Sequence, residues 1–327
     1  MIITGNKKKV VILAFNVGRS GELVNGPGIS LRNLLFFLKT FYPKVSISIF
    51  TSYSVTDRVA GVRYFKINDS DSLRLEIKAS DVVHCWSGLR DRFLEGVCLA
   101  NKEGRPVILG PNLIDGVEYT AEQRFLDKIN FDLLLTANPR LRYFLTKIHG
   151  LNFSKTSSFM VGPDLDLWTP PSKVGEYILW KGNGRNPVKD VRFAKRVSQN
   201  SRMQKYRFVF LGDEKRFDYK NCIGIASQAR LYINTSLSET KGMAQLEQMA
   251  AGVPSVTHPK VYCHGENYVT GIVTNKTVDD YADAIEEIME DNKLRKDLMA
   301  GSRSYIEENF LPQDIASKYM EILENVS

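Results

Sequence analysis

The feature that most constrains the fold is an alternation of short apolar runs with helical stretches along most of the 327 residues. An early example is the run 9–17, which is followed by the amphipathic stretch Ile29–Tyr42. Strands that alternate with helices pair in parallel, because each crossover carries the chain back across the sheet. The sequence therefore predicts an α/β fold. Strands are expected at 9–17, 45–53, 81–86, 106–110, 132–138, 177–182, 206–213, 229–236 and 253–258.

A break in this alternation lies at 161–176, which holds three prolines and two glycines and has no helical period. Such a stretch is typical of an interdomain linker. We expect two Rossmann-like doubly wound domains facing across a cleft, one formed by 1–165 and the other by 166–312. Two helices are predicted within 277–310. An amphipathic helix at 313–327 is expected to return to the first domain.

The net charge of +7 is distributed unevenly along the chain. Residues 1–165 hold 22 Lys and Arg against 15 Asp and Glu, whereas residues 166–327 hold 22 of each. The excess of positive charge therefore lies in the first half, which favours an anionic partner such as a nucleic acid, a membrane surface or a charged glycan.

Several classes of protein are disfavoured by the composition. No segment approaches the ~20 apolar residues of a membrane-spanning helix, and the run Val10–Val17 after three lysines has no cleavage site typical of a signal peptide. The four cysteines show no metal-ligand spacing and are expected to be free thiols in a reducing compartment. We expect a cytoplasmic protein without a transmembrane segment, which associates at most peripherally with a membrane.

The stretch Ser236–Val256 (SLSETKGMAQLEQMAAGVPSV) carries the strongest functional pattern. Glu239 and Glu247 are eight positions apart, and Gly242 lies between them at the predicted start of a helix. Exposed N–H groups in the first turn of a helix bind anions, and carboxylates accept hydrogen bonds from hydroxyls. A nucleotide sugar has a diphosphate between two rings that bear hydroxyls, so it fits this arrangement. The alternative is that Glu239 caps the helix and Glu247 is solvated.

This stretch resembles the signature of the family-4 retaining glycosyltransferases, which have the GT-B fold and include the glycosyl transferases group 1. The signature has a strand ending in serine, two glutamates eight apart with a glycine between them, and a helix of small residues. The resemblance extends in order along most of the chain and includes GPGISLRNLLFFL, DVVHCWSG and VGPDLDLWTP.

The resemblance implies roles for individual residues. Glu239 would contact hydroxyls of the donor sugar, and Glu247 would bind the ribose. The backbone of Lys241, Gly242, Met243 and Ala244 would hold the sugar and the phosphates, and Gly28 belongs to a glycine loop on the donor side.

The same resemblance implies an arginine and a lysine on the diphosphate, which here fall in KGNGRNPVKD. Lys189 matches the lysine. Asn183 stands where the family has its arginine, so Arg185 is the predicted substitute and Lys181 the alternative.

Two further patterns bear on catalysis. His84 ends a predicted strand and is a candidate for a place near the anomeric carbon, with packing at the strand end as the alternative. Asp164 and Asp166 match a D-x-D metal motif but lie in the predicted linker, so we expect no metal and no cofactor other than the nucleotide-sugar substrate, with UDP as the expected nucleotide.

We therefore expect a retaining, metal-independent glycosyltransferase that moves a hexose or pentose. The acceptor is expected to be a surface glycan or a lipid-linked saccharide at an anionic membrane. Arg19, Arg32, Arg90 and Arg92 are candidates for contact with it. Three alternatives stay open: a phage-type enzyme that modifies hydroxymethylated DNA, a non-catalytic protein that binds sugar nucleotides or DNA, and an epimerase.

Overall fold

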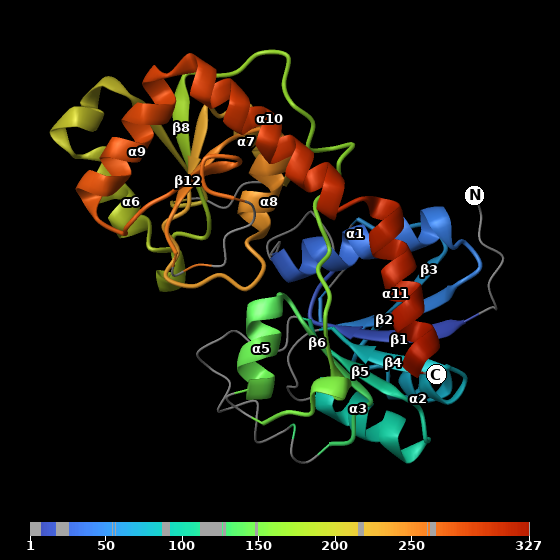
Figure 1. The fold of residues 1–327 in the computed structure, drawn as a ribbon. Coiled ribbons are helices and arrows are strands. Elements are labelled where there is room, and N and C mark those ends of the chain that lie inside the picture. Colours follow the sequence, from blue (N-terminus) through green and yellow to red (C-terminus); the bar gives the residue numbers. More distant parts are fainter. Residues whose placement is uncertain are drawn as a thin grey trace. The chain divides into compact units, whose positions relative to one another are not determined.

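A computed structural model describes residues 8–17, 26–53, 55, 57–86, 92–111, 126, 129–147, 150–214, 219–259, 261 and 266–326. The chain divides into two compact units (Figure 1). Unit 1 consists of Met1–Val161 and Pro312–Ser327, and unit 2 of Gly162–Leu311. Each unit holds one parallel sheet covered by helices, so the predicted α/β class is confirmed.

Unit 1 is built on a seven-stranded sheet in the order β3-β2-β1-β4-β5-β6-β7, and every pairing in it is parallel. The first strand of the chain lies in the middle of this sheet, and Val10 to Ala14 are almost completely buried. Burial on both faces explains why the strand is a continuous apolar run. The strands are β1 Lys9–Ala14, β2 Ser46–Thr51, β3 Val62–Lys66, β4 Val82–Cys85, β5 Val107–Leu109, β6 Leu133–Thr136 and β7 Thr156–Ser158.

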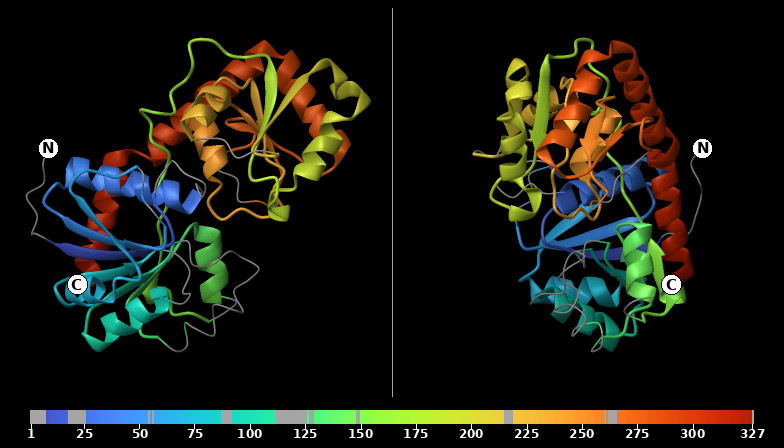
Figure 2. Two further views of the ribbon diagram at one scale, coloured as in Figure 1. Left: turned by 180° about the vertical axis from the view of Figure 1, so that it is seen from behind. Right: turned by 60° about the vertical axis from the view of Figure 1, so that its left-hand side comes forward.

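Helices cover both faces of this sheet. The described helices are α1 Gly26–Phe41, α2 Ser70–Lys78, α3 Arg92–Lys102, α5 Pro139–Lys147 and α11 Pro312–Val326, with a 3-10 turn at Phe153–Lys155. α2, α3 and α5 share one core cluster with the side chains of Val11 and Leu13. α11 packs beside α1 (Figure 2), although it comes from the far end of the sequence. Its buried residues Ile315, Tyr319 and Leu323 recur every four positions and form the packed stripe.

His84 joins α11 to the sheet through two buried hydrogen bonds. Nε2 lies 2.7 Å from the carbonyl oxygen of Gly110, and Nδ1 lies 2.6 Å from the hydroxyl of Tyr319. A carbonyl only accepts, so Nε2 carries the proton and the tyrosine hydroxyl donates to Nδ1. Burial lowers the pKa of His84 to about 4, which keeps the ring neutral. The prediction that His84 lies at a reacting centre is wrong, because the side chain is fully buried and both ring nitrogens are occupied.

Unit 2 is built on a five-stranded parallel sheet in the order β12-β11-β10-β8-β9. The strands are β8 Tyr177–Lys181, β9 Arg207–Leu211, β10 Leu231–Ile233, β11 Ser255–Thr257 and β12 Gly271–Val273. The helices are α6 Val191–Ser198, α7 Tyr219–Ser227, α8 Met243–Ala250, α9 Val278–Glu290 and α10 Asn292–Asn309, with 3-10 turns at Pro187–Lys189 and Ser201–Lys205. The two helices predicted within 277–310 are therefore confirmed. Among the described helices, none has the length and apolar character needed to cross a membrane.

The bond between Tyr319 and His84 gives a test of how α11 is held. Tyr319→Phe removes the donor to a buried nitrogen, and we expect it to lower the free energy of unfolding by about 1–3 kcal/mol. Tyr42→Phe is the matched control, because its hydroxyl donates to Ser317 on the same helix at a partly buried position, 3.0 Å away. Urea unfolding should show the larger loss for Tyr319→Phe. Equal losses would contradict the buried acceptor role of His84.

Candidate active site in unit 2

The strand order of unit 2 reverses between β8 and β10. The first strand of the unit, β8, lies between the second, β9, and the third, β10. Connections on the two sides of such a reversal run to opposite faces of the sheet, which opens a crevice beyond the carboxyl ends of the two strands. The loop after β8 contains Lys189, and the loop after β10 contains Glu239. Both predicted residues therefore lie where the topology favours ligand binding.

Lys189 and Glu239 form an ion pair across this reversal. Lys189 Nζ lies 2.5 Å from Glu239 Oε1, and the hydroxyl of Ser236 donates to the same oxygen at 2.7 Å. The lysine side chain is 27% exposed and the glutamate 10%, so the pair is partly open to solvent. The pair places one cation and one carboxylate together at the edge of the sheet.

The two loops that carry this pair are fixed by further hydrogen bonds. The amide of Leu237 donates to the carbonyl oxygen of Val188 at 2.7 Å. Lys276 donates both to Asp190 Oδ2 at 2.8 Å and to the carbonyl oxygen of Thr235 at 2.7 Å. Because bonded loops lose little further freedom when a ligand binds, the positions of Lys189 and Glu239 are set in advance.

His258 supports the same loop from the neighbouring strand. Its Nε2 lies 2.8 Å from the carbonyl oxygen of Ser236, and the side chain is buried directly after β11. The carbonyl accepts, so Nε2 donates. The sequence analysis gave His258 no role. Its position at a strand end, next to the expected ligand loop, is the signal that points to it.

Gly242 begins α8 as the sequence predicts. It adopts φ 62° and ψ 42°, a left-handed conformation that glycine enters without a Cβ clash, and no side chain caps the helix. The N–H groups of the first helical turn have no partner within the helix. The amides of Met243 and Ala244 are therefore at a helix start that a bound anion would complete.

Glu247 lies on α8 inside a buried polar cluster. Lys181, the last residue of β8, places Nζ 2.5 Å from Glu247 Oε2, and the hydroxyl of Tyr219 donates to Oε1 at 2.6 Å. The indole of Trp168 donates to the same hydroxyl at 2.8 Å, and its ring lies 4.4 Å from Lys181 Nζ. Glu247 is only 2% exposed and Lys181 13% exposed. The alternative of a solvated Glu247 is therefore wrong.

This cluster contains residues that the sequence analysis did not identify. Tyr219 and Trp168 were given no role, and Lys181 was only the alternative to Arg185. Arg185 is exposed and forms no ion pair with any described residue, whereas Lys181 contacts one of the two predicted acids. The end position of Lys181 in its strand is a signal for this role. No pattern around Tyr219 or Trp168 indicates that the two side chains meet.

Lys241 is almost completely buried directly before Gly242. Burial disfavours the charged form and lowers the pKa of its amine to about 7. The backbone of Lys241 was predicted to help hold the sugar and the phosphates. Burial of the side chain fixes this backbone at the start of α8.

The site residues predicted in unit 1 lie in other surroundings. Gly28 is buried in α1, where an added Cβ would lie 2.9 Å from Asn16 Oδ1, so close packing accounts for the glycine. Arg32 pairs with Asp57 at 3.0 Å and is 13% exposed. Arg92 is exposed and pairs with Glu95 within α3. Arg32 is largely buried in its ion pair, whereas Arg92 is exposed in a surface ion pair, which is weak, so its contact with an acceptor stays a prediction. Arg19 and Arg90 lie outside the described residues.

The D-x-D match in the linker forms a turn. Asp164 Oδ1 accepts a hydrogen bond from the amide of Asp166 at 3.1 Å, and Asp164 is buried. Across the described part of the chain, no group of three or more His, Cys, Asp or Glu side chains is arranged to hold a metal ion.

Comparisons with known proteins agree with this geometry. Residues 192–305, which include the loop of Glu239 and all of α8, match the family model described as Glycosyl transferases group 1. No curated protein sequence matches the chain.

Solved structures match the chain over nearly its whole length. Sucrose-phosphate synthase from Thermosynechococcus elongatus has a TM-score of 0.72 at 14% identity, covering 97% of this chain and 98% of that chain. A glycosyltransferase from Rickettsia africae has a TM-score of 0.72 at 14% identity, with 98% and 99% covered. The pneumococcal O-GlcNAc transferase, solved with UDP and GlcNAc, has a TM-score of 0.70 at 10% identity, with 98% and 99% covered.

At these identities the structural likeness shows the fold, which is that of the GT-B glycosyltransferases. The expected resemblance is confirmed for the fold of the chain and for residues 192–305, which match the group 1 family model.

The two ion pairs predict different losses of stability. Glu247→Gln leaves Lys181 without its carboxylate in a buried site, and we expect a loss of roughly 3 kcal/mol in the free energy of unfolding. Glu239→Gln leaves the more exposed Lys189, so its loss should be about 1 kcal/mol or less. Urea unfolding without nucleotide measures both. Glu290→Gln, at a surface pair with Lys205, is the control and should change stability little. Equal losses for Glu247→Gln and Glu239→Gln would contradict the burial argument.

Proposed function

We propose that the protein is a retaining glycosyltransferase that moves a sugar from a UDP-sugar to an anionic saccharide acceptor, with the donor bound by unit 2. The observation that carries this proposal is the start of α8 at Gly242, which has no side-chain cap and lies in the chain between two glutamates that each pair with a lysine. A nucleotide sugar matches this site in chemistry, because it has hydroxyls at both ends and a diphosphate between them.

Each group of the site receives a role in this proposal. The amides of Met243 and Ala244 bind the diphosphate together with Lys189. Glu239 accepts hydrogen bonds from hydroxyls of the sugar. Glu247 accepts them from the ribose, while Lys181 and Tyr219 hold its carboxylate in a fixed orientation.

The proposed reaction exchanges one bond at the anomeric carbon. The bond from this carbon to the diphosphate oxygen breaks, and a bond to the acceptor hydroxyl oxygen forms on the same face. The acceptor proton passes to the departing phosphate oxygen, so no nucleophilic carboxylate is needed. Negative charge grows on the leaving diphosphate, where Lys189 and the helix amides stabilise it without a metal.

Two of the structural neighbours support the choice of UDP. The pneumococcal transferase was solved with UDP and GlcNAc, and a trehalose-6-phosphate protein from E. coli with UDP-2-fluoro glucose. The acceptor part of the proposal rests on the excess of positive charge in residues 1–165. The exposed thiol of Cys98 agrees with a reaction in the cytoplasm, because a reducing compartment keeps cysteines as thiols.

The roles of the two glutamates are separable by mutation. Glu239→Ala should lose transfer by a factor of about 100 or more while keeping UDP affinity, because its contacts are to the sugar. Glu247→Ala should weaken UDP binding by about tenfold or more, because a charge-assisted bond to ribose is lost. Calorimetry measures the affinity for UDP, and a transfer assay measures the rate of sugar transfer. Unchanged turnover in Glu239→Ala would refute its role.

The donor, the stereochemistry and the acceptor can be determined in one series. A thermal-shift screen over UDP-, GDP- and ADP-sugars should select a UDP-sugar. Proton NMR of the product should then show the same anomeric configuration as the donor, and an inverted anomer would contradict retention. Parallel reactions with phosphorylated glycans and with hydroxymethylated DNA test the acceptor. Transfer to DNA alone would overturn the saccharide acceptor, and failure to bind any nucleotide sugar would overturn the proposal as a whole.

A further inference from the structure

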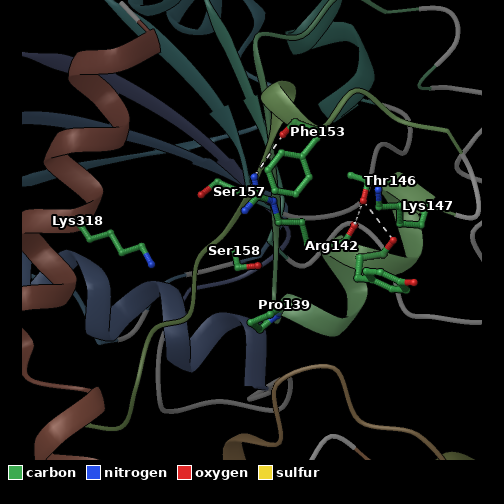
Figure 3. A pocket seen from close by; sticks show the side chains of 9 residues that line it. Pro139, Arg142, Thr146, Lys147, Phe153, Ser157, Ser158 and Lys318 are labelled. Atoms are coloured by element: carbon green, nitrogen blue, oxygen red, sulfur yellow. Dashed lines mark hydrogen bonds between the residues drawn. The ribbon is translucent and has the colours of Figure 1, made fainter.

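A cavity of about 380 Å³ lies within unit 1, and none of the residues assigned to the donor is among those that line it (Figure 3). It is formed by one side of α5, by β7 with the turn before it, and by Lys318 of α11. This volume is within the range of about 300–1,000 Å³ that small-molecule sites occupy. Three of the nine residues that line it are cations, namely Arg142, Lys147 and Lys318, and none of the nine is acidic.

Arg142 is held in a fixed position at the cavity. Its Nε donates to Thr156 Oγ1 at 3.2 Å and its Nη2 to the carbonyl oxygen of Phe153 at 3.3 Å. The guanidinium carbon lies 3.7 Å from the centre of the Phe153 ring, so the group stacks on that ring. A guanidinium has five N–H donors, and no described residue accepts from Nη1. The arginine therefore keeps donors for an oxyanion in a geometry that is already set.

Lys147 and Lys318 bring two more charges from different elements. Lys147 is the last residue of α5, and Lys318 extends from α11 toward Ser157 and Ser158 (Figure 3). Neither lysine, nor Arg142, forms an ion pair with a carboxylate among the described residues. Three positive charges that line one cavity without counter-charges favour an anion inside it.

Uncharged groups in the wall suit a saccharide. The hydroxyl of Ser157 has no partner among the described residues and is available to a ligand. Tyr143 and Phe153 are 63% and 59% exposed, so they offer ring faces beside the cations. The C–H faces of sugar rings pack on aromatic rings, while the hydroxyls bond to polar groups such as serine.

We propose that this cavity binds a phosphate group carried by a saccharide, with Arg142, Lys147 and Lys318 on the phosphate and Tyr143 and Phe153 beside the sugar. The inference that this saccharide is part of the acceptor rests on the proposed function, whereas the binding of the phosphosaccharide does not. The phosphate is either a monoester on a sugar or a diester within a polymer, since both present the same oxyanions to the three cations.

A different explanation for the charges is protection of the sheet edge. β7 is the last strand of the sheet, and β6 is its pairing partner among the described strands. Lysines near an open edge prevent pairing with another chain. This explanation predicts self-association when the charges are removed and no saturable binding of phosphosaccharides, so it is separable from the proposal.

The test compares the two lysines of the cavity with a lysine elsewhere in unit 1. Lys147→Gln with Lys318→Gln should weaken the binding of glucose 6-phosphate by about tenfold or more, because two charge-assisted contacts are lost. Lys102→Gln is the matched control, because Lys102 is also an exposed last residue of a helix in unit 1. The affinity of the Lys102→Gln variant for glucose 6-phosphate should stay within about twofold of that of the unchanged chain, as expected for a remote surface charge. Calorimetry on the full chain measures both.

Three further ligands test which part of the phosphosaccharide the cavity binds. Glucose should bind far more weakly than glucose 6-phosphate, because it has no phosphate. Inorganic phosphate should also bind more weakly than glucose 6-phosphate, because it has no sugar ring to contact Tyr143 and Phe153. A glycerol phosphate oligomer represents the diester, and its affinity relative to glucose 6-phosphate identifies the source of the phosphate. The proposal is overturned if neither phosphorylated saccharide nor oligomer binds saturably, if Lys102→Gln loses as much affinity as the double variant, or if the double variant only self-associates.

The same samples separate this proposal from the proposed function. UDP affinity should be the same in the Lys147 and Lys318 double variant as in the unchanged chain. A chain that binds glucose 6-phosphate but no nucleotide sugar would uphold the cavity and refute the donor site. Binding of UDP with no phosphosaccharide binding would refute the cavity alone.

Discussion

The reversal of strand order between β8 and β10 decides where chemistry is located in unit 2. It turns the two following connections to opposite faces of the sheet, so that their first residues leave an open crevice. Lys189 comes from one connection and Glu239 from the other, and their ion pair joins the two connections. The start of α8 follows a few residues later on the same connection. The cation, the carboxylate and the helix amides are therefore positioned by one feature of the topology.

The two ion pairs of this site differ in what they stabilise. Lys189 and Glu239 are partly exposed, so a ligand reaches them at a small cost in desolvation. Glu247 is buried and Lys181 is only partly exposed, with Tyr219 donating to the second carboxylate oxygen. A buried ion pair of this kind is costly to break and holds its geometry closely. In the proposed function, the more exposed pair contacts the reacting sugar, and the less exposed pair recognises the nucleotide.

Much of the fold was predictable, because period and composition are local properties. The buried strand at 9–17 and the two helices within 277–310 follow from apolar runs and from 3.6-residue spacing. The half-exposed strand Val62–Lys66 and the short α2 were not predicted, since neither has a continuous apolar run. In the candidate site, Glu239 and Glu247 were found from their spacing around Gly242, and Lys189 from the resemblance to the glycosyltransferase family. The contact partners Tyr219 and Trp168 are 51 residues apart, and no local pattern relates them.

The sequence by itself determined the α/β class, the start of α8 at Gly242 and the two glutamates on either side of it, because these depend on residues close together in the chain. Only the tertiary structure decided which cation meets which acid. It also showed that His84 is a buried link to α11, and that Arg142, Lys147 and Lys318 line one cavity. Lys318 is more than 170 residues from the other two cations along the chain. Contacts at such separations depend on how helices pack on the sheet, and that packing is a property of the whole unit.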